Sequence, residues 1–251
     1  MIRFFAAPED ISDVSIALSA DDTAHIHSLR LRPDEFFIVC DGNGTDYICR
    51  LGKRGGDPVA EIVDSRQAHG EPSVTCNVFI AYAKGERLDY AVQKSVELGA
   101  RCIALFKSHR CIAVPRDVHK KTERLKRIAL ETAKQCGRGI IPDVYAAGSF
   151  EEAVSIASQS PALPLFFYEC EGTVHIGKVL EKHFAPLRKR EQYETTAVSI
   201  VTGPEGGFEP HEAEYAKSKG MFTVSLGPRI LRCETAPVVA LSAVMYHTGN
   251  L

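Results

Sequence analysis

Two short segments in the C-terminal half of this sequence combine glycine, arginine and carboxylate residues in a way that suits a binding site. The first follows the apolar stretch 197–201 and reads Thr202-Gly203-Pro204-Glu205-Gly206-Gly207-Phe208. Glycines directly after a strand let the main chain approach a ligand closely. The segment has neither the Gly-Lys-Ser/Thr ending of a P-loop nor the spacing of a dinucleotide site. A ligand-binding loop is one interpretation, and a plain tight turn is the other.

The second segment lies one strand later and reads Gly227-Pro228-Arg229-Ile230-Leu231-Arg232-Cys233-Glu234-Thr235-Ala236-Pro237. A turn explains its glycine and first proline, while Thr235 suits the N-cap of a helix and Pro237 its first turn. These structural roles leave Arg229, Arg232 and Glu234 unexplained. Arginines can stabilise a developing anion or orient a phosphate, and a carboxylate can act as a general base or anchor an arginine.

The elements that must position these segments are strands and helices in alternation. Apolar runs predict strands over 74–83, 102–106, 163–168, 197–202 and 222–226. Helical patterns lie between and after them, over 86–98, 120–136, 150–157, 210–219 and 236–247. Ser149 and Glu152 form a capping-box pair, and Gly99 suits a helix end. Such alternation predicts a mostly parallel α/β sheet with both glycine segments at the carboxyl ends of strands.

The first seventy residues have a different pattern, of short strands and turns. Residues 35–40 and 45–51 are strand-like and flank the turn Asp41-Gly42-Asn43-Gly44, which predicts a hairpin. Another apolar run covers 59–63. This pattern indicates a small β-barrel ahead of the α/β domain.

Charge is unevenly distributed along the chain, although its formal net charge is only -2. Residues 107–138 hold ten Lys/Arg and three Asp/Glu, whereas residues 1–75 hold seven and thirteen. Helical geometry places one set of side chains on the outer face of the helix over 120–136, with Arg138 just beyond it: Lys120, Arg124, Arg127, Glu131, Gln135 and Arg138. A solvated face is the ordinary explanation, but a basic stripe also suits RNA phosphates. Weaker candidates for an RNA face on the first domain are Arg3, His25, His27, Arg30 and Arg32.

Other features narrow the class of protein. The eight cysteines include no C-x-x-C pair, so we expect no structural metal. The N-terminus lacks the apolar core of a secretory signal, and no apolar stretch has the length of a membrane span. We therefore expect a cytoplasmic protein.

The two glycine segments, taken with three further stretches, resemble the 16S rRNA uracil-N3 methyltransferase family of the SPOUT superfamily. The stretches are the opening Arg3-Phe4-Phe5, the segment 93–99 (QKSVELG), and Gln135-Cys136-Gly137-Arg138. The resemblance implies a PUA-like RNA-binding β-barrel over 1–72 and a SPOUT α/β domain with a trefoil knot over 73–251. It also implies a homodimer, S-adenosyl-L-methionine as cofactor, and 16S ribosomal RNA or the small ribosomal subunit as substrate.

The resemblance also implies roles for particular residues. The cofactor would be bound by Thr202, Gly203, Pro204, Glu205, Gly206, Gly207, Ser225, Leu226, Gly227, Ile230 and Leu231, with 167–169 as a third wall. Catalytic candidates are Arg232, Glu234 and Arg229. The charge pattern, rather than the resemblance, gives the RNA-binding candidates Arg3, Arg30, Arg32, Arg124, Arg127, Gln135 and Arg138. Cys233, where threonine is commoner, and Pro237 depart from the family pattern.

Two alternatives remain open at this point. A SPOUT methyltransferase could act on another RNA, such as transfer RNA. A non-catalytic RNA-binding or ribosome-assembly factor could keep the fold without the cofactor, although the intact glycines at 203, 206, 207 and 227 argue against it.

Overall fold

The computed structural model describes residues 1–32, 34–159, 162–170, 173–188 and 196–251. Its chain contacts divide these residues into two compact units. The first contains residues 1–71 together with 131–141, and the second contains residues 72–130 together with 142–251. Each unit has its own sheet and its own buried core, so each is described separately.

The first unit is built on a sheet of five described strands in the order β1-β3-β4-β5-β2. β1 runs parallel to β3, and the other pairs are antiparallel. The elements are β1 (Arg3–Phe5), a 3-10 turn (Pro8–Asp10), β2 (Ser15–Ala17), α1 (Ala20–Ser28), β3 (Phe36–Cys40), β4 (Thr45–Arg54) and β5 (Asp57–Gln67). The hairpin predicted around 41–44 is confirmed, and Gly42 and Gly44 supply its positive φ angles of 73° and 104°. The core is apolar and includes Phe4, Ile16, Ile26, Phe37 and Val39.

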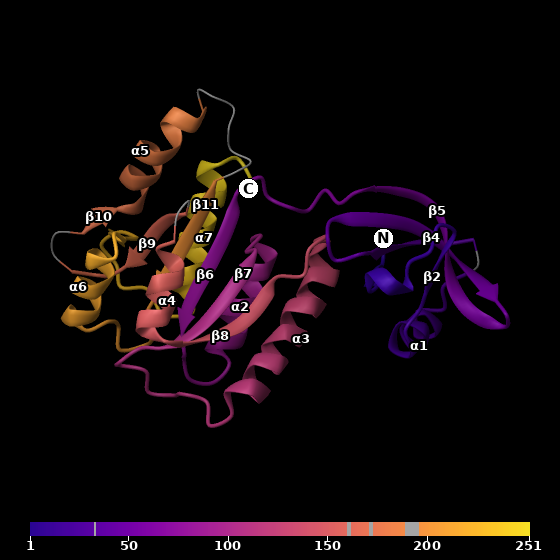
Figure 1. Cartoon of the computed structure of the whole chain (residues 1–251), viewed down its shortest axis with the longest axis horizontal. Helices are drawn as coiled ribbons and strands as arrows, with labels where there is room; N and C mark the ends of the chain where they lie inside the picture. The colour runs from indigo at the N-terminus through magenta and orange to yellow at the C-terminus, as the bar shows by residue number, and fades with distance from the viewer. Residues whose placement is uncertain (33, 160–161, 171–172, 189–195) are drawn as a thin grey trace. The chain divides into compact units, whose positions relative to one another are not determined.

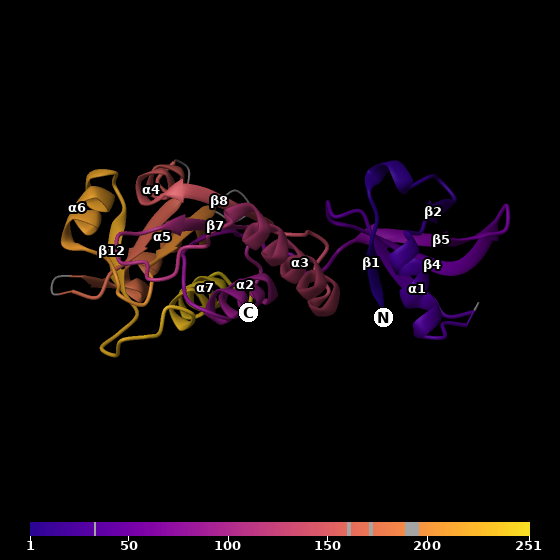
Figure 2. The ribbon, with the colours of Figure 1, turned by 90° about the horizontal axis from the view of Figure 1, so that it is seen from below.

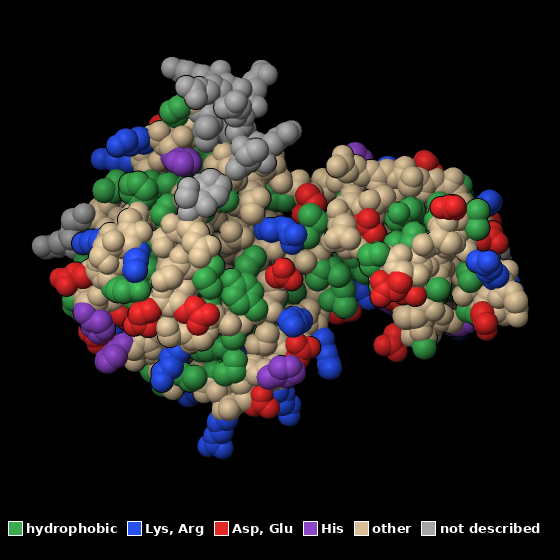
Figure 3. Space-filling model, viewed as in Figure 1, with side chains coloured by type: hydrophobic (Ala, Val, Ile, Leu, Met, Phe, Trp, Pro, Cys, Tyr) green, Lys and Arg blue, Asp and Glu red, His purple; other side chains and the backbone are tan. Residues whose placement is uncertain are grey.

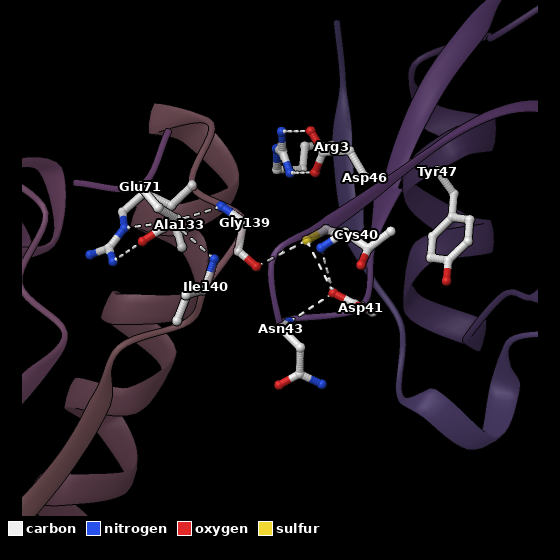
Figure 4. Close-up of polar contacts among 12 residues, drawn as sticks. Arg3, Cys40, Asp41, Asn43, Asp46, Tyr47, Glu71, Ala133, Gly139 and Ile140 are labelled. Carbon is white, nitrogen blue, oxygen red and sulfur yellow. Dashed lines mark hydrogen bonds and ion pairs between the residues drawn. The ribbon is translucent and has the colours of Figure 1, made fainter. Parts of the chain in front are cut away.

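A segment from much later in the chain completes this unit. Gly139 accepts a hydrogen bond from the Gly44 amide (3.1 Å) and another from Cys40 Sγ (3.0 Å). The carboxylate of Glu71 accepts hydrogen bonds from the amides of Gly139 (2.9 Å) and Ile140 (3.0 Å), as Figure 4 shows. A Cβ at position 139 would lie 2.2 Å from that of Ala68, so the close approach requires glycine.

The second unit contains a parallel sheet of seven described strands in the order β10-β12-β9-β11-β6-β7-β8. Its strands are β6 (Thr75–Ala81), β7 (Cys102–Lys107), β8 (Asp143–Ser149), β9 (Leu163–Phe167), β10 (Val174–His175), β11 (Ala197–Thr202) and β12 (Phe222–Ser225). Its helices are α2 (Arg87–Glu97), α4 (Phe150–Ala157), α5 (Ile176–Arg188), α6 (Pro210–Ser218) and α7 (Thr235–His247), and α3 (Val118–Cys136) begins in it.

Helices cover both faces of this sheet. α4 and α6 lie on one face, and α2 and α7 lie on the other (Figures 1 and 2). On the α4 side the rings of Phe150, Phe166 and Phe208 pack together, with the last two only 4.4 Å apart between centroids. Because parallel strands are buried on both faces, their sequences are continuous apolar runs, as predicted.

The predicted fold class, a parallel α/β domain preceded by a small β domain, is confirmed. The five predicted strands and five predicted helices of the second unit are present. The sequence did not predict β1, β2, α1, β8, β10 or α5. β8 is rich in alanine and glycine, which have weak strand propensity, and α5 contains Pro186, which usually interrupts a helical pattern.

The capping predictions had mixed outcomes. Ser149 caps α4 by accepting the Glu152 amide at 3.2 Å, and Gly99 follows α2 with a φ of 91°. The prediction that Thr235 is an N-cap is wrong. Glu234 holds that position in α7, because the chain is already helical at residue 234 with φ -75° and ψ -25°. None of the described helices is long and apolar enough to span a bilayer.

Candidate active site

The two glycine segments meet at the carboxyl edge of the parallel sheet. Strands β11 and β12 both pair with β9, so the loops that follow these three strands are neighbours. They enclose a cavity of about 830 Å³. This volume lies within the range of small-molecule sites, which is roughly 300–1,000 Å³.

The glycines of the loop after β11 allow close contacts and, at one position, a positive φ angle. A Cβ on Gly203 would lie 3.1 Å from the Phe208 ring, which is fixed in the core. A Cβ on Gly206 would lie 3.0 Å from Cβ of Arg110, and Gly207 has a φ of 67°. The loop is thus held against two neighbours, and its main chain lines the cavity.

The loop after β12 is positioned by its backbone and by the strand next to it. Gly227 has a φ of 114°, a conformation that side-chain-bearing residues rarely adopt. The amide of Leu231 donates to the carboxylate of Glu169 at 3.4 Å, which ties this loop to the segment after β9. The expected third wall of the cavity, residues 167–169, is therefore present.

Most of the predicted site residues line this one cavity. They are Thr202, Gly203, Pro204, Glu205, Gly206, Gly207, Ser225, Leu226, Ile230, Leu231, Arg232 and Glu234. Gly227 and Arg229 are not among the lining residues, and the Arg229 side chain is exposed. Cys233 also lines the cavity. Burial, followed by a hydrogen bond to Glu234, raises the pKa of its thiol to about 12, so it is a neutral group.

Two arginines that the sequence did not single out also line the cavity. Arg110, after β7, donates two hydrogen bonds to Glu209 (2.7 and 3.0 Å) and one to the Gly206 carbonyl (3.1 Å). Arg87, the first residue of α2 after β6, donates to Glu205 at 2.9 Å. Both follow strands that end at the same edge of the sheet. That placement is the signal by which sequence reasoning could have found them.

The basic helix α3 partly matches its prediction. Leu125, Ala129 and Thr132 are buried, while Arg124, Arg127 and Gln135 are exposed. Arg138 differs, because α3 ends at Cys136 and Gly137 turns the chain with a φ of 80°. The side chain of Arg138 is only 3% exposed and pairs with Glu71.

The first unit shows a similar division among its RNA-binding candidates. Arg30 and Arg32 are exposed. The side chain of Arg3 is only 7% exposed and forms a two-point ion pair with Asp46, at 2.5 and 2.7 Å (Figure 4). We therefore do not carry Arg3 or Arg138 into the RNA-binding surface. Acidic side chains are spread over the face of this unit drawn in Figure 3, in agreement with its composition.

The fold and the cavity define an RNA methyltransferase preceded by a PUA domain. A family model described as an RNA methyltransferase domain matches residues 70–245, and one described as an RNA methyltransferase PUA domain matches residues 18–62. The chain belongs to the family of the ribosomal RNA small subunit methyltransferases E.

Individual relatives agree with this placement. The chain is 30% identical to ribosomal RNA small subunit methyltransferase E of Synechocystis sp., over 96% of this chain and 76% of the relative. It is 29% identical to the Bacillus subtilis protein of that name, over 94% and 92% of the two chains. A crystal structure of the Neisseria gonorrhoeae protein, bound to S-adenosyl methionine, superposes with a TM-score of 0.83 at 29% identity, covering 98% and 97%.

Proposed function

We propose that this enzyme transfers a methyl group from S-adenosyl-L-methionine to N3 of a uridine in 16S ribosomal RNA. The observation that carries the proposal is the cavity between the glycine loops, in a chain of this family. The names of its relatives specify small-subunit ribosomal RNA, and the Neisseria gonorrhoeae relative binds the cofactor.

The residues of the cavity fit this cofactor. A Cβ at position 203 or 206 would lie only 3.1 or 3.0 Å from a neighbouring side chain, so glycine suits both positions. The backbone itself forms this part of the wall and offers amides and carbonyls to an adenosine. Apolar side chains of Leu226, Ile230 and Leu231 line the opposite wall, as a planar base requires. When bound, the cofactor supplies an electrophilic methyl group.

The residues of the enzyme must favour loss of the proton from uracil N3. The neutral base carries a proton there, which must pass to solvent water, and its loss leaves an anion that a cation can stabilise. Arg232 is exposed, lines the cavity and has no ion-pair partner among the described residues, so we assign it this role. Glu234 is held by Arg87 and by the Cys233 thiol, which favours an anchoring role over that of the general base.

The RNA is held by cations outside the cavity. On α3, Lys120 and Arg127 are exposed and form no ion pair within the described part of the chain. Arg124 is exposed but pairs with Asp89, and Gln135 adds an amide. We propose that these side chains, with Arg30 and Arg32, contact phosphates, while the target uridine is unstacked to expose N3.

Several wider features complete the proposal. The RNA-binding part is the PUA-like domain 1–72 with residues 131–141 packed on it, and the catalytic part is the remainder of 73–251. The C-terminal chain forms a trefoil knot around the cofactor loops, the active form is a homodimer, and the enzyme works in the cytoplasm, where its RNA substrate lies. The packing of α7 against α2 and α5 supports the return of the chain past those loops.

Transfer of labelled methyl groups to small ribosomal subunits that lack the modification tests this function. We expect 3-methyluridine as the product, identified by nucleoside mass spectrometry. Cofactor binding without transfer would contradict the assigned substrate and favour another RNA. Failure to bind the cofactor would contradict the enzymatic assignment itself.

A further inference from the structure

Arg87 occupies a special place in the wall of the cavity. It is the first residue of α2 and follows β6, which is the neighbour of β11 in the sheet. Its Nη1 donates to Glu205 Oε1 at 2.9 Å, and its Nε lies 3.9 Å from Glu234 Oε2. Glu205 belongs to the loop after β11 and Glu234 to the N-terminus of α7. One guanidinium group is thus in contact with carboxylates of both cofactor loops.

The partners of Arg87 are themselves well fixed. Oε1 of Glu205 also accepts the backbone amide of Lys84 at 2.8 Å, from the turn between β6 and α2. The side chains of Glu205 and Glu234 are only 17% and 16% exposed. Burial alone would raise the pKa of Glu205, but the hydrogen bonds from Lys84 and Arg87 outweigh it and lower the pKa. The carboxylate of Glu205 therefore stays ionised and accepts hydrogen bonds from both Lys84 N and Arg87 Nη1.

We propose that Arg87 is a positioning residue that couples the two cofactor loops, setting the shape of the cavity without acting on the substrate. The inference rests on the proposed cofactor. It gives Glu205 and Glu234 anchoring roles, because the carboxylate oxygens that face Arg87 also accept hydrogen bonds from other groups of the protein, Lys84 N and Cys233 Sγ.

Removing the guanidinium would have two physical effects. Among the described residues, the Lys84 amide would be the remaining hydrogen-bond donor from the β6–α2 turn to the loop after β11. In addition, two poorly hydrated carboxylates would face the space left by one lost cation, and like charges repel. Both effects act on the separation of the loops, so they should weaken cofactor binding more than RNA binding.

Isothermal titration with S-adenosyl-L-methionine and with S-adenosylhomocysteine tests this coupling. For Arg87→Met we expect binding to weaken by about tenfold, the size of one charge-assisted hydrogen bond. Arg87→Lys, which keeps the charge, should recover part of the loss. Arg87→Met combined with Glu234→Gln should bind better than Arg87→Met alone, since the mutual repulsion is relieved. The matched control is Lys94→Met, which removes an ion pair from the same helix outside the cavity.

Steady-state kinetics separate a positioning role from general destabilisation. We expect the KM for the cofactor to rise in Arg87→Met while the KM for RNA and the melting temperature stay close to those of Lys94→Met. Equal cofactor affinity in the wild type and Arg87→Met would overturn the inference. If Arg87→Met does not fold, unchanged cofactor affinity in both Arg87→Lys and Glu234→Gln would overturn it as well. A wild-type protein that binds no cofactor would instead refute the proposed function.

Discussion

Glu71 and Arg138 form a two-point ion pair across 67 positions of sequence. Nη2 of Arg138 lies 2.5 Å from Oε2 of Glu71, and its Nε lies 3.2 Å from Oε1. The same carboxylate accepts the amides of Gly139 and Ile140. This contact joins the segment after α3 to residues 1–71 within the first unit. A single carboxylate thus connects parts of the chain that the sequence analysis assigned to two domains, 1–72 and 73–251.

Glu71→Gln should destabilise the first unit. The substitution removes the charge that Arg138 pairs with and one acceptor of a buried network, which we expect to lower the free energy of unfolding by about 2 kcal/mol. Urea denaturation followed by circular dichroism measures it. Glu123→Gln, in an exposed pair with Lys126, is the control and should have no measurable effect. Equal stability of the two variants would contradict the anchoring role of Glu71.

Gly227→Ala should impair cofactor binding. Apart from the two adjacent residues, no described residue has a heavy atom within 4 Å of the added Cβ, so the expected penalty is that of the backbone conformation at a φ of 114°, about 1–3 kcal/mol. The loop is expected to shift to relieve this strain. Gly220→Ala, at a φ of 84° outside the cavity, carries a similar backbone penalty and should leave calorimetric cofactor affinity unchanged. Retained affinity in Gly227→Ala would show that the loop tolerates the new conformation.

Arg232→Ala should lower kcat by about a hundredfold, the typical effect of removing one group that stabilises a developing anion. Cofactor affinity should change much less, because the assigned role concerns the uracil. Single-turnover methyl transfer and calorimetry measure the two quantities. The control is Lys217→Ala, an exposed lysine of α6. An unchanged kcat would exclude Arg232 from the chemistry.

Buried thiols should make the protein sensitive to alkali. Burial raises the pKa of both Cys49 and Cys76 to about 12, from an unperturbed 9.0. Between pH 9 and about pH 12 the unfolded chain loses thiol protons that the folded chain retains. Stability is therefore intact below pH 9 and falls as the pH rises toward 12, by about 1.4 kcal/mol per pH unit for each thiol. Denaturation curves between pH 8 and 11 should be less pH-dependent for Cys76→Ala than for the wild type.

The sequence alone predicted those structural features whose physical cause is local. Continuous apolar runs identified the buried parallel strands, and their order along the chain predicted that loops at 203–208 and 226–234 share one edge of a sheet. The glycines in those loops could be recognised as site residues, because a binding site formed by the main chain requires residues without a bulky side chain. The family resemblance rests on these same residues, and the family assignment is confirmed.

Only the tertiary structure decided which charged side chains are available to bind RNA or the cofactor. Arg3, Arg87, Arg110 and Arg138 look alike in the sequence, yet two are buried in ion pairs of the first unit and two line the cavity. Helical periodicity correctly predicted which side chains of α3 are exposed as far as Cys136, where the helix ends. It could not predict the position of Arg138, which lies beyond the helix. An ion pair between distant positions leaves no local pattern, because its energy depends on where folding places the partner carboxylate.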